Sequence, residues 1–347
     1  MKKIAFVDHS HHKKTKSSLF FKKILEKRYK VDYYWDDSWS GNTKGFDFNI
    51  FQNNNYAIVI FWQVFPELET VQKIKLPIIW VPMYDSVCMM PKEFWERLAK
   101  MHINIISFSK KISEYLRDYE GLLSVQYYLK PVKYRAGVDK RVNIFFWDRG
   151  DINFNVVKKI VGKQKVNKIV YKYDCDPGKS NRLPSKEYMK KYGISLMKGR
   201  FSRRVYVNLL SKCSVFIQPR MVEGIGLAFI EAMAYGAAVI SPDFPTMNEY
   251  IRDGYNGFLY NPMKIKEIDL GNLAEIRKNL WMSNNEGYRE WLENTKKIQV
   301  FITKVIDENK RNYKYKLELN KRVSEYIKKY LLIFKLKIYY ILLRIVN

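Results

Sequence analysis

The chain has 347 residues, of which 47% are hydrophobic, so it is long enough for two packed cores and too apolar to be disordered throughout. Its 62 basic and 35 acidic residues give a net charge of +27, which points to an anionic partner: a nucleic acid, an anionic membrane surface or a phosphorylated substrate. The three cysteines are too few and too scattered for a disulfide framework, which favours a reducing compartment.

The first half of the chain alternates short apolar runs with polar or helical segments. Strands are expected at 3–7, 31–34, 56–62, 77–82 and 103–108, and a helix over 19–28. Strands that alternate with helices predict a parallel α/β sheet, whose binding loops follow the carboxyl ends of the strands.

The pattern restarts after a polar, turn-prone stretch at 127–141, which we interpret as an interdomain hinge. Strands are expected at 142–147, 168–173, 214–218 and 237–240. The predicted organisation is therefore an α/β domain at 1–135, a second at 141–286, a domain-crossing helix at 287–310 and a basic tail at 311–347.

The most specific pattern is a strand, a glycine-spaced turn and a helix that begins near residue 226. Gly224 and Gly226 allow a tight turn and a close approach to a ligand, and Gly236 suits the position just past the helix. Glu223 precedes the helix, and Glu231 lies more than a turn inside it. Because the first N–H groups of a helix are unpaired and carry the positive end of its dipole, a phosphate fits at this turn.

This segment resembles the signature of the retaining, nucleotide-sugar-dependent GT-B glycosyltransferases, the family called glycosyl transferases group 1. The resemblance is close over 218–262 and looser over 142–262. It implies that Glu223 contacts the transferred sugar, that Glu231 binds the nucleotide ribose, and that both belong to an E-x7-E pair. The backbone amides that the resemblance assigns to the diphosphate are those of Gly224, Ile225, Gly226 and Leu227.

The resemblance also implies the fold: α/β, GT-B, with two Rossmann-like domains facing a cleft. The nucleotide-diphosphate sugar would bind the C-terminal domain and the acceptor the N-terminal one. The reaction would retain the anomeric configuration, and the leaving phosphate would take the acceptor's proton, so no protein base is required. No cofactor is expected.

Several further residues are donor-site candidates. Arg149 matches the family's diphosphate-binding arginine and is assigned a catalytic role beside Glu223. The family's lysine has no match at Phe154 or Asn155, so Lys158, Lys159 or a residue elsewhere would substitute for it. Tyr173 and Arg200 are further donor-binding candidates. Arg200, Arg203 and Arg204 read equally well as phosphate ligands or surface residues, and Ser202 is expected to cap the helix after it.

Asp174 and Asp176 follow an apolar strand and resemble the metal-binding DxD of the other large glycosyltransferase fold. A magnesium ion that bridges carboxylates and diphosphate makes chemical sense there. Since three-letter matches are common and the fold evidence points the other way, we expect a metal-independent enzyme.

The N-terminal candidates for acceptor or sugar contacts are His9, His11, Tyr84 and Asp85. The histidines cluster with His12 and nearby lysines in the first loop, where they would bind a phosphate or the sugar; zinc is disfavoured because no other ligand is evident. Tyr84 stands where many relatives of the family carry a histidine, so that residue's role does not transfer.

The termini concentrate positive charge. Residues 311–347 carry ten basic and two acidic residues among bulky apolar ones, and their longest uncharged apolar run, at 338–343, is too short to cross a bilayer. We expect a basic amphipathic C-terminal helix on an anionic membrane surface, with packing across the domains or a dimer contact as alternatives. Only residues 4–7 are apolar before Asp8, so no signal peptide is expected and the location would be cytoplasmic, peripheral on the inner membrane face.

The leading hypothesis is a glycosyltransferase that extends a lipid-linked or polymeric surface saccharide such as lipopolysaccharide or capsule. One alternative is a nucleic-acid-binding protein that uses its basic charge and aromatic residues, although no motif of that class appears and nucleic acid is not expected as a partner. The other alternative is a catalytically silent saccharide-binding relative.

Overall fold

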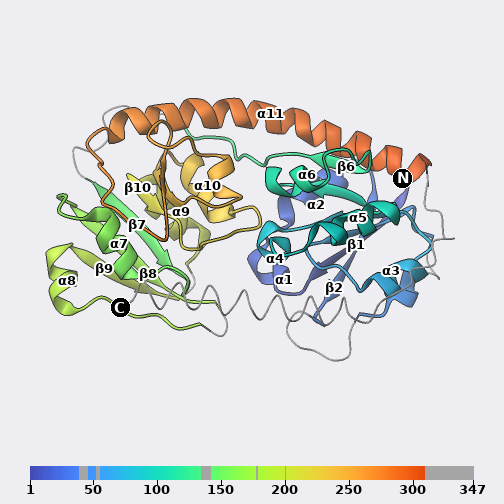
Figure 1. The fold of residues 1–347 in the computed structure, drawn as a ribbon, viewed down its shortest axis with the longest axis horizontal. Helices are drawn as coiled ribbons and strands as arrows, with labels where there is room; N and C mark the ends of the chain where they lie inside the picture. The colour runs from blue at the N-terminus through green and yellow to red at the C-terminus, as the bar shows by residue number, and fades with distance from the viewer. Residues whose placement is uncertain (39–45, 52–54, 134–141, 177–178, 200, 309–347) are drawn as a thin grey trace. The chain divides into compact units, whose positions relative to one another are not determined.

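The computed structural model describes residues 1–38, 46–51, 55–133, 142–176, 179–199 and 201–308. These residues form two compact units (Figure 1). The N-terminal unit contains residues 1–126 and the part of the last helix from Trp291, and the C-terminal unit contains residues 127–290. The basic tail predicted at 311–347 lies outside the described residues.

The N-terminal unit is built on one parallel sheet of six strands in the order β2-β1-β3-β4-β5-β6. Its strands are β1 (Lys3–His9), β2 (Lys30–Asp36), β3 (Ile58–Trp62), β4 (Ile78–Val81), β5 (Asn104–Ser107) and β6 (Leu122–Ser124). Its helices are α1 (His12–Thr15), α2 (Leu19–Leu25), α3 (Leu68–Lys73), α4 (Tyr84–Val87), α5 (Lys92–Lys100) and α6 (Lys110–Tyr115), with a 3-10 turn η2 (Phe48–Phe51). Strands β3 and β4 are buried along their whole length, as expected for central strands of a parallel sheet covered on both faces.

The C-terminal unit repeats this architecture with the strand order β12-β11-β10-β7-β8-β9, again all parallel. Its strands are β7 (Asn143–Asp148), β8 (Lys168–Tyr173), β9 (Ile194–Lys198), β10 (Val215–Ile217), β11 (Ala238–Pro242) and β12 (Phe258–Tyr260). Its helices are α7 (Phe154–Val161), α8 (Lys186–Lys191), α9 (Arg203–Ser211) and α10 (Leu227–Ala234), with a 3-10 turn η3 (Met247–Glu249). The order reverses at β7 and β10, and at such switch points the strand carboxyl ends of α/β sheets bind ligands.

The last described helix, α11 (Leu273–Glu308), contributes its first half to the C-terminal unit and its second half to the N-terminal unit. Its buried positions recur every three or four residues, so one stripe of the helix faces the cores. The helix expected at 287–310 therefore begins earlier, at Leu273. The units divide between Gln126 and Tyr127, at the start of the stretch interpreted as a hinge.

Every strand expected from the sequence is present, and the predicted α/β class with two parallel sheets is confirmed. The strands β6, β9 and β12 were not predicted. They lie at or next to sheet edges and are short or only half-buried, so their sequences lack the continuous apolar runs of central strands. In the described part of the chain, no helix is both long and apolar enough to cross a membrane.

Candidate active site

The glycine-spaced turn between β10 and α10 is formed as the sequence predicts. Gly226 has φ 73° and ψ 50°, a left-handed conformation that favours glycine, and α10 starts at the next residue. The side chain of Ile225 is only 6% exposed, so this residue offers its backbone and not its side chain to a ligand. The first N–H groups of α10 have no partner within the helix, which makes this end of the helix a place for an anion.

Glu223 lies just before this helix, with its side chain 12% exposed. Its carboxylate Oε1 accepts a hydrogen bond of 3.2 Å from Gln218 Nε2, and its backbone carbonyl accepts one of 3.4 Å from Thr246 Oγ1. Gln218 is buried at the end of β10, so the strand itself holds the glutamate in place. The predicted catalytic carboxylate is therefore largely shielded from solvent and anchored at two points.

Arg149 reaches Glu223 from the end of β7. Its Nη1 lies 3.6 Å from Glu223 Oε1, while its Nε and Nη2 donate to Asp176 Oδ1 at 3.0 and 2.8 Å. The guanidinium also lies 5.2 Å from the ring centre of Trp147. The two residues assigned as catalytic from the sequence are thus brought together, and Asp176 fixes the arginine's orientation.

A second arginine, Arg220, was not predicted and joins the same group. Its Nη1 lies 3.7 Å from Glu223 Oε2, and its Nε lies 3.4 Å from Asp151 Oδ2 and 3.8 Å from Asp176 Oδ2. Lys179 is ion-paired with Asp151. The charge cluster of Arg149, Arg220, Lys179, Asp151, Asp176 and Glu223 therefore holds three basic and three acidic side chains around the loop before α10.

The lysines considered as substitutes for the family's lysine lie elsewhere. Lys158 on α7 donates to the hydroxyl of Tyr188 at 3.2 Å and sits over that ring, and Lys159 is exposed. Arg220, which approaches Glu223 within 3.7 Å, is the second cation that the fold supplies at this position.

Glu231 lies one turn into α10 and is ion-paired with Arg203, the first residue of α9. Burial raises the pKa of Glu231, and Arg203 acts in the opposite direction. Ser202 Oγ accepts the Val205 N–H at 3.3 Å, so the predicted cap of this helix is confirmed. Of the arginines named from the sequence, Arg203 contacts the candidate ribose ligand, while Arg200 lies outside the described residues.

Asp148 supports the turn that carries Arg149. It is fully buried, its side chain accepts hydrogen bonds from the Tyr171 hydroxyl and the Gly150 N–H, and burial raises its pKa. Tyr173 is its partner in the register of β7 and β8 and packs against the hydrophobic core. Tyr173 therefore lies at the correct edge of the sheet for a donor contact, although it also has a packing role.

The two aspartates of the DxD pattern both have basic partners. Asp176 is held by the arginines, and Asp174 accepts a hydrogen bond of 2.9 Å from the buried Lys172. Among the described residues, three histidine or acidic side chains come close enough to hold one metal ion in the N-terminal unit, at Asp8, His9 and His12, and not at the DxD pattern.

The N-terminal candidates lie at or just after the carboxyl ends of β1 and β4. His9 is 8% exposed, whereas His11 is exposed. Tyr84 opens α4 and is 9% exposed, and Asp85 follows it. Gln63, after β3, links the two groups, because it contacts His9 Nε2 at 3.1 Å through Oε1 and donates to Ser86 Oγ at 3.2 Å through Nε2.

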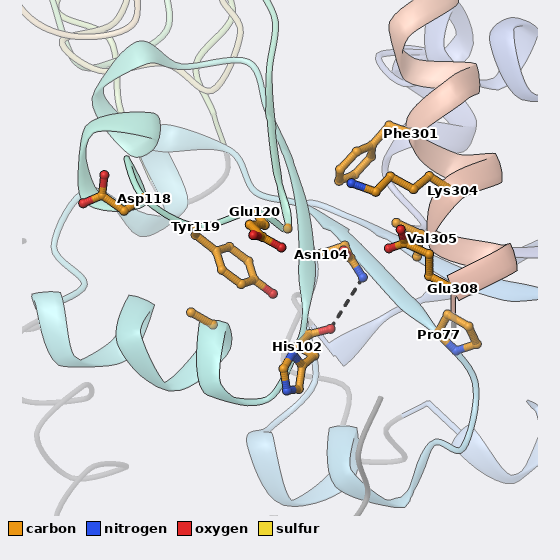
Figure 2. Close-up of a pocket in the computed structure, with 12 residues that line it drawn as sticks. Pro77, His102, Asn104, Asp118, Tyr119, Glu120, Phe301, Lys304, Val305 and Glu308 are labelled. Carbon is orange, nitrogen blue, oxygen red and sulfur yellow. Dashed lines mark hydrogen bonds between the residues drawn. The ribbon is translucent and has the colours of Figure 1, made fainter. Parts of the chain in front are cut away.

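A separate cavity of about 460 Å³ lies at the opposite, amino end of β4, β5 and β6 (Figure 2). Its lining includes Asn104 and Glu120 from the sheet side and Lys304 and Glu308 from the end of α11. It contains none of the candidate site residues, and it lies at the edge of the sheet away from the strand ends that usually bind ligands.

The site has the residues and the turn of a known family. Residues 155–298 match the family model described as Glycosyl transferases group 1. This part of the chain is similar to that family. It is 31% identical over 152 residues to an uncharacterized glycosyltransferase, MJ1178, of Methanocaldococcus jannaschii, a match that covers 42% of this chain and 39% of the relative. A sucrose synthase of Thermosynechococcus vestitus is 31% identical over 111 residues, which are 32% of this chain and 12% of that protein. The chain thus spans well under half the length of these curated relatives.

Solved structures show the same fold over most of the chain. Anabaena Alr3699/HepE in complex with UDP matches with a TM-score of 0.60 and 12% identity, covering 88% of this chain and 100% of that one. The apo form of the lipopolysaccharide outer core galactosyltransferase WaaB matches with a TM-score of 0.51 and 15% identity, covering 82% and 90%. The predicted GT-B fold is confirmed, and the predicted family is matched over residues 155–298.

Proposed function

We propose that this protein is a retaining glycosyltransferase that moves a sugar from a nucleoside-diphosphate donor to a saccharide acceptor. The observation that carries the proposal is the grouping of Arg149, Arg220 and Glu223 beside the start of α10, with Glu231 one turn further on. Such a site offers cations and helix N–H groups to a diphosphate and carboxylates to the sugar and ribose hydroxyls. Structural neighbours solved with UDP support a uridine nucleotide as the first donor to test.

In the proposed reaction, the bond between the anomeric carbon and the diphosphate oxygen breaks while the acceptor oxygen attacks from the same face. Arg149, Arg220 and the first N–H groups of α10 stabilise the negative charge that grows on the leaving diphosphate. The acceptor's proton passes to a phosphate oxygen of the leaving group. Glu223 orients the sugar hydroxyls and favours positive charge at the anomeric carbon.

Glu231 would bind the ribose hydroxyls of the donor. Its ion pair with Arg203 keeps the carboxylate in place, and only 19% of its side chain is exposed. A buried acceptor that loses its ribose partner costs about 1–3 kcal/mol, so the site would distinguish nucleotides by their ribose hydroxyls.

We further propose that donor binding needs no metal ion. Arginine side chains lie where the diphosphate would bind, and Asp176, the carboxylate of the DxD pattern nearest to the site, is already held by Arg149 at 2.8 Å. On this view the chemistry of the transfer belongs to side chains and backbone of the C-terminal unit alone.

The acceptor would bind the N-terminal unit near His9, His11, Tyr84 and Asp85. We propose a lipid-linked or polymeric surface saccharide at the cytoplasmic face of the membrane. The support is the sequence of residues 311–347, with ten basic and two acidic residues among bulky apolar ones.

The test is nucleotide binding by thermal shift of the full chain with UDP, GDP, ADP and CMP, each with and without EDTA. Glu231→Gln removes the proposed ribose ligand, and Glu275→Gln, on an exposed position of the same unit, is the matched control. We expect one nucleoside diphosphate to raise Tm regardless of EDTA, and only the Glu231 variant to lose the shift.

No shift with any nucleotide would overturn the donor-site assignment. A shift without sugar transfer to oligosaccharide acceptors would favour the silent saccharide-binding alternative, and transfer with inversion at the anomeric carbon, read by NMR of the product, would contradict the proposed stereochemistry.

A further inference from the structure

Three ligand-bearing side chains meet at the carboxyl end of β1. Asp8 and His9 end the strand, and His12 begins α1 after a two-residue turn. Asp8 is fully buried, and the two histidines are each 8% exposed. One ligand atom from each of the three residues lies within 4.8 Å of the other two. From the sequence, zinc was disfavoured because no ligand besides the histidines was evident; the structure brings Asp8 to them.

Hydrogen bonds fix both imidazole rings. Gln63 donates its amide Nε2 to Ser86 Oγ, so its Oε1 faces His9 and accepts the proton of His9 Nε2 at 3.1 Å. This leaves the lone pair of His9 on Nδ1. His12 Nδ1 lies 2.6 Å from Asp8 Oδ1. An imidazole whose second nitrogen is held by an outer polar group is the usual arrangement of a metal ligand, and Gln63 supplies that outer contact for His9.

The ligand atoms are spaced for a small cation after side-chain rotation. One atom from each residue lies within 4.8 Å of the other two. Ligand atoms about 2.0–2.2 Å from a tetrahedral Zn²⁺ are roughly 3.4 Å from one another, so the group closes when these distances shorten by up to about 1.4 Å.

We propose that Asp8, His9 and His12 form a binding site for a divalent cation of the Zn²⁺ class. The proton that His12 Nδ1 shares with Asp8 moves to Nε2 of the same ring, so that Nδ1 binds the metal, and His9 Nδ1 and the Asp8 carboxylate complete the protein ligands. Two imidazoles and one carboxylate are a donor set that zinc and its first-row neighbours prefer. The site goes beyond the proposed function, because donor binding beside α10 uses none of these residues and the proposed acceptor contact of His9 involves no metal.

The ammonium group of Lys22 competes with a bound cation for the Asp8 carboxylate. Its Nζ lies 3.8 Å from Asp8 Oδ2, which also accepts a 2.6 Å hydrogen bond from Ser18 Oγ. Its ammonium is 4.2 Å from the ring centre of Trp35, and its side chain is 11% exposed. Because this ammonium and a bound cation repel each other across one carboxylate, removal of the lysine charge is expected to strengthen metal binding.

The experiment is titration of untagged full-length protein, stripped with a chelator and then freed of it. Co²⁺ is followed by its visible absorption, and Zn²⁺ by competition with a chromophoric chelator. The chain has four histidines, which makes a complete set of variants practical. His9→Gln and His12→Gln test the ligands, and the exposed His11→Gln and His102→Gln are controls.

We expect one equivalent of metal, an affinity at least tenfold weaker in the two ligand variants, unchanged affinity in the two controls and tighter binding by Lys22→Met. A stoichiometry of zero, or equal losses in the ligand and control variants, would overturn the proposal. The Lys22→Met variant tests the site even if the ligand variants misfold, because unfolding does not increase metal affinity. An unchanged affinity in Lys22→Met would also contradict the proposal. Retained nucleotide binding by the C-terminal unit separates failure of this site from failure of the donor site.

Discussion

Substitution of Gly226 by alanine tests whether the start of α10 binds the donor. Gly226 has φ 73°, where a residue with a Cβ atom is strained by roughly 1–2 kcal/mol. A Cβ built there would meet Phe229 Cβ at 3.6 Å and Glu223 Cβ at 3.8 Å, which are ordinary contacts. The cost is therefore backbone strain alone, and any relief of it turns the N–H groups that follow away from their present direction.

Gly236 provides a matched control at the other end of the same helix. It has φ 79°, and the nearest atom to a Cβ there is Arg277 Nη2 at 4.0 Å. Both alanine variants should thus lose about 1–2 kcal/mol of unfolding free energy. For a unit of this size each kcal/mol lowers Tm by about 2–4 °C, so equal shifts of a few degrees are expected.

The two alanine variants are expected to differ in their affinity for the donor. If the strain at Gly226 is released at the expense of the phosphate contacts, 1–2 kcal/mol corresponds to about 5- to 30-fold weaker binding of the nucleoside diphosphate. Gly236→Ala should bind as the wild type does. Isothermal titration at a temperature well below both Tm values measures this directly, and equal affinities in the two variants would refute the role of the helix start.

Two further substitutions probe the supports of the site. Asp148→Asn should cost about 1–3 kcal/mol, because one oxygen acceptor becomes a donor that faces donors. Burial raises the pKa of Asp148, so the folded state binds a proton on this carboxyl more tightly than the unfolded state does. The stability that the wild type gains from this proton is therefore greatest in acid. It declines as pH rises from the ordinary aspartate pKa through the raised pKa of the folded state. Denaturant unfolding across that window should therefore show the variant's relative loss shrinking with pH, and a constant difference would contradict the assignment. Ser202→Ala removes the cap of α9, which should cost about 1 kcal/mol of stability and weaken ribose binding through Arg203. Ser185→Ala removes the equivalent cap of α8 and should cost stability alone. Equal nucleotide affinities in the two variants would argue against Arg203 as a support of Glu231.

The sheets could be predicted because their central strands are continuous apolar runs. Residues 58–62 and 78–81 are all buried, and a continuous apolar run of this kind is typical of a central strand in the core of a parallel sheet. The strand β9 (Ile194–Lys198) is half-buried at a sheet edge, where its polar and apolar residues give no such signal. Local pattern therefore predicted the centre of each unit and missed its margins.

The residues of the candidate site also divide into those that local pattern predicts and those that it misses. Glu223, Gly226 and Glu231 lie on one short strand-turn-helix segment, so their spacing alone relates them. Arg220 lies in the irregular loop before Glu223, where no period determines the direction of a side chain, and its partners Asp151 and Asp176 come from other loops. These contacts depend on the strand order, in which β7 lies between β10 and β8, and a sequence does not display that order directly.

The charge cluster around Glu223 has equal numbers of basic and acidic side chains, so an incoming diphosphate does not meet a locally positive surface. It would instead be attracted by the charge of the whole protein, +27, and then replace carboxylates as the partner of Arg149 and Arg220. The carboxylates hold the guanidinium groups in place before the donor arrives, at distances of 2.8–3.8 Å. The arginines need little reorganisation when negative charge develops on the leaving group, and that property is the one that makes a polar site effective in catalysis.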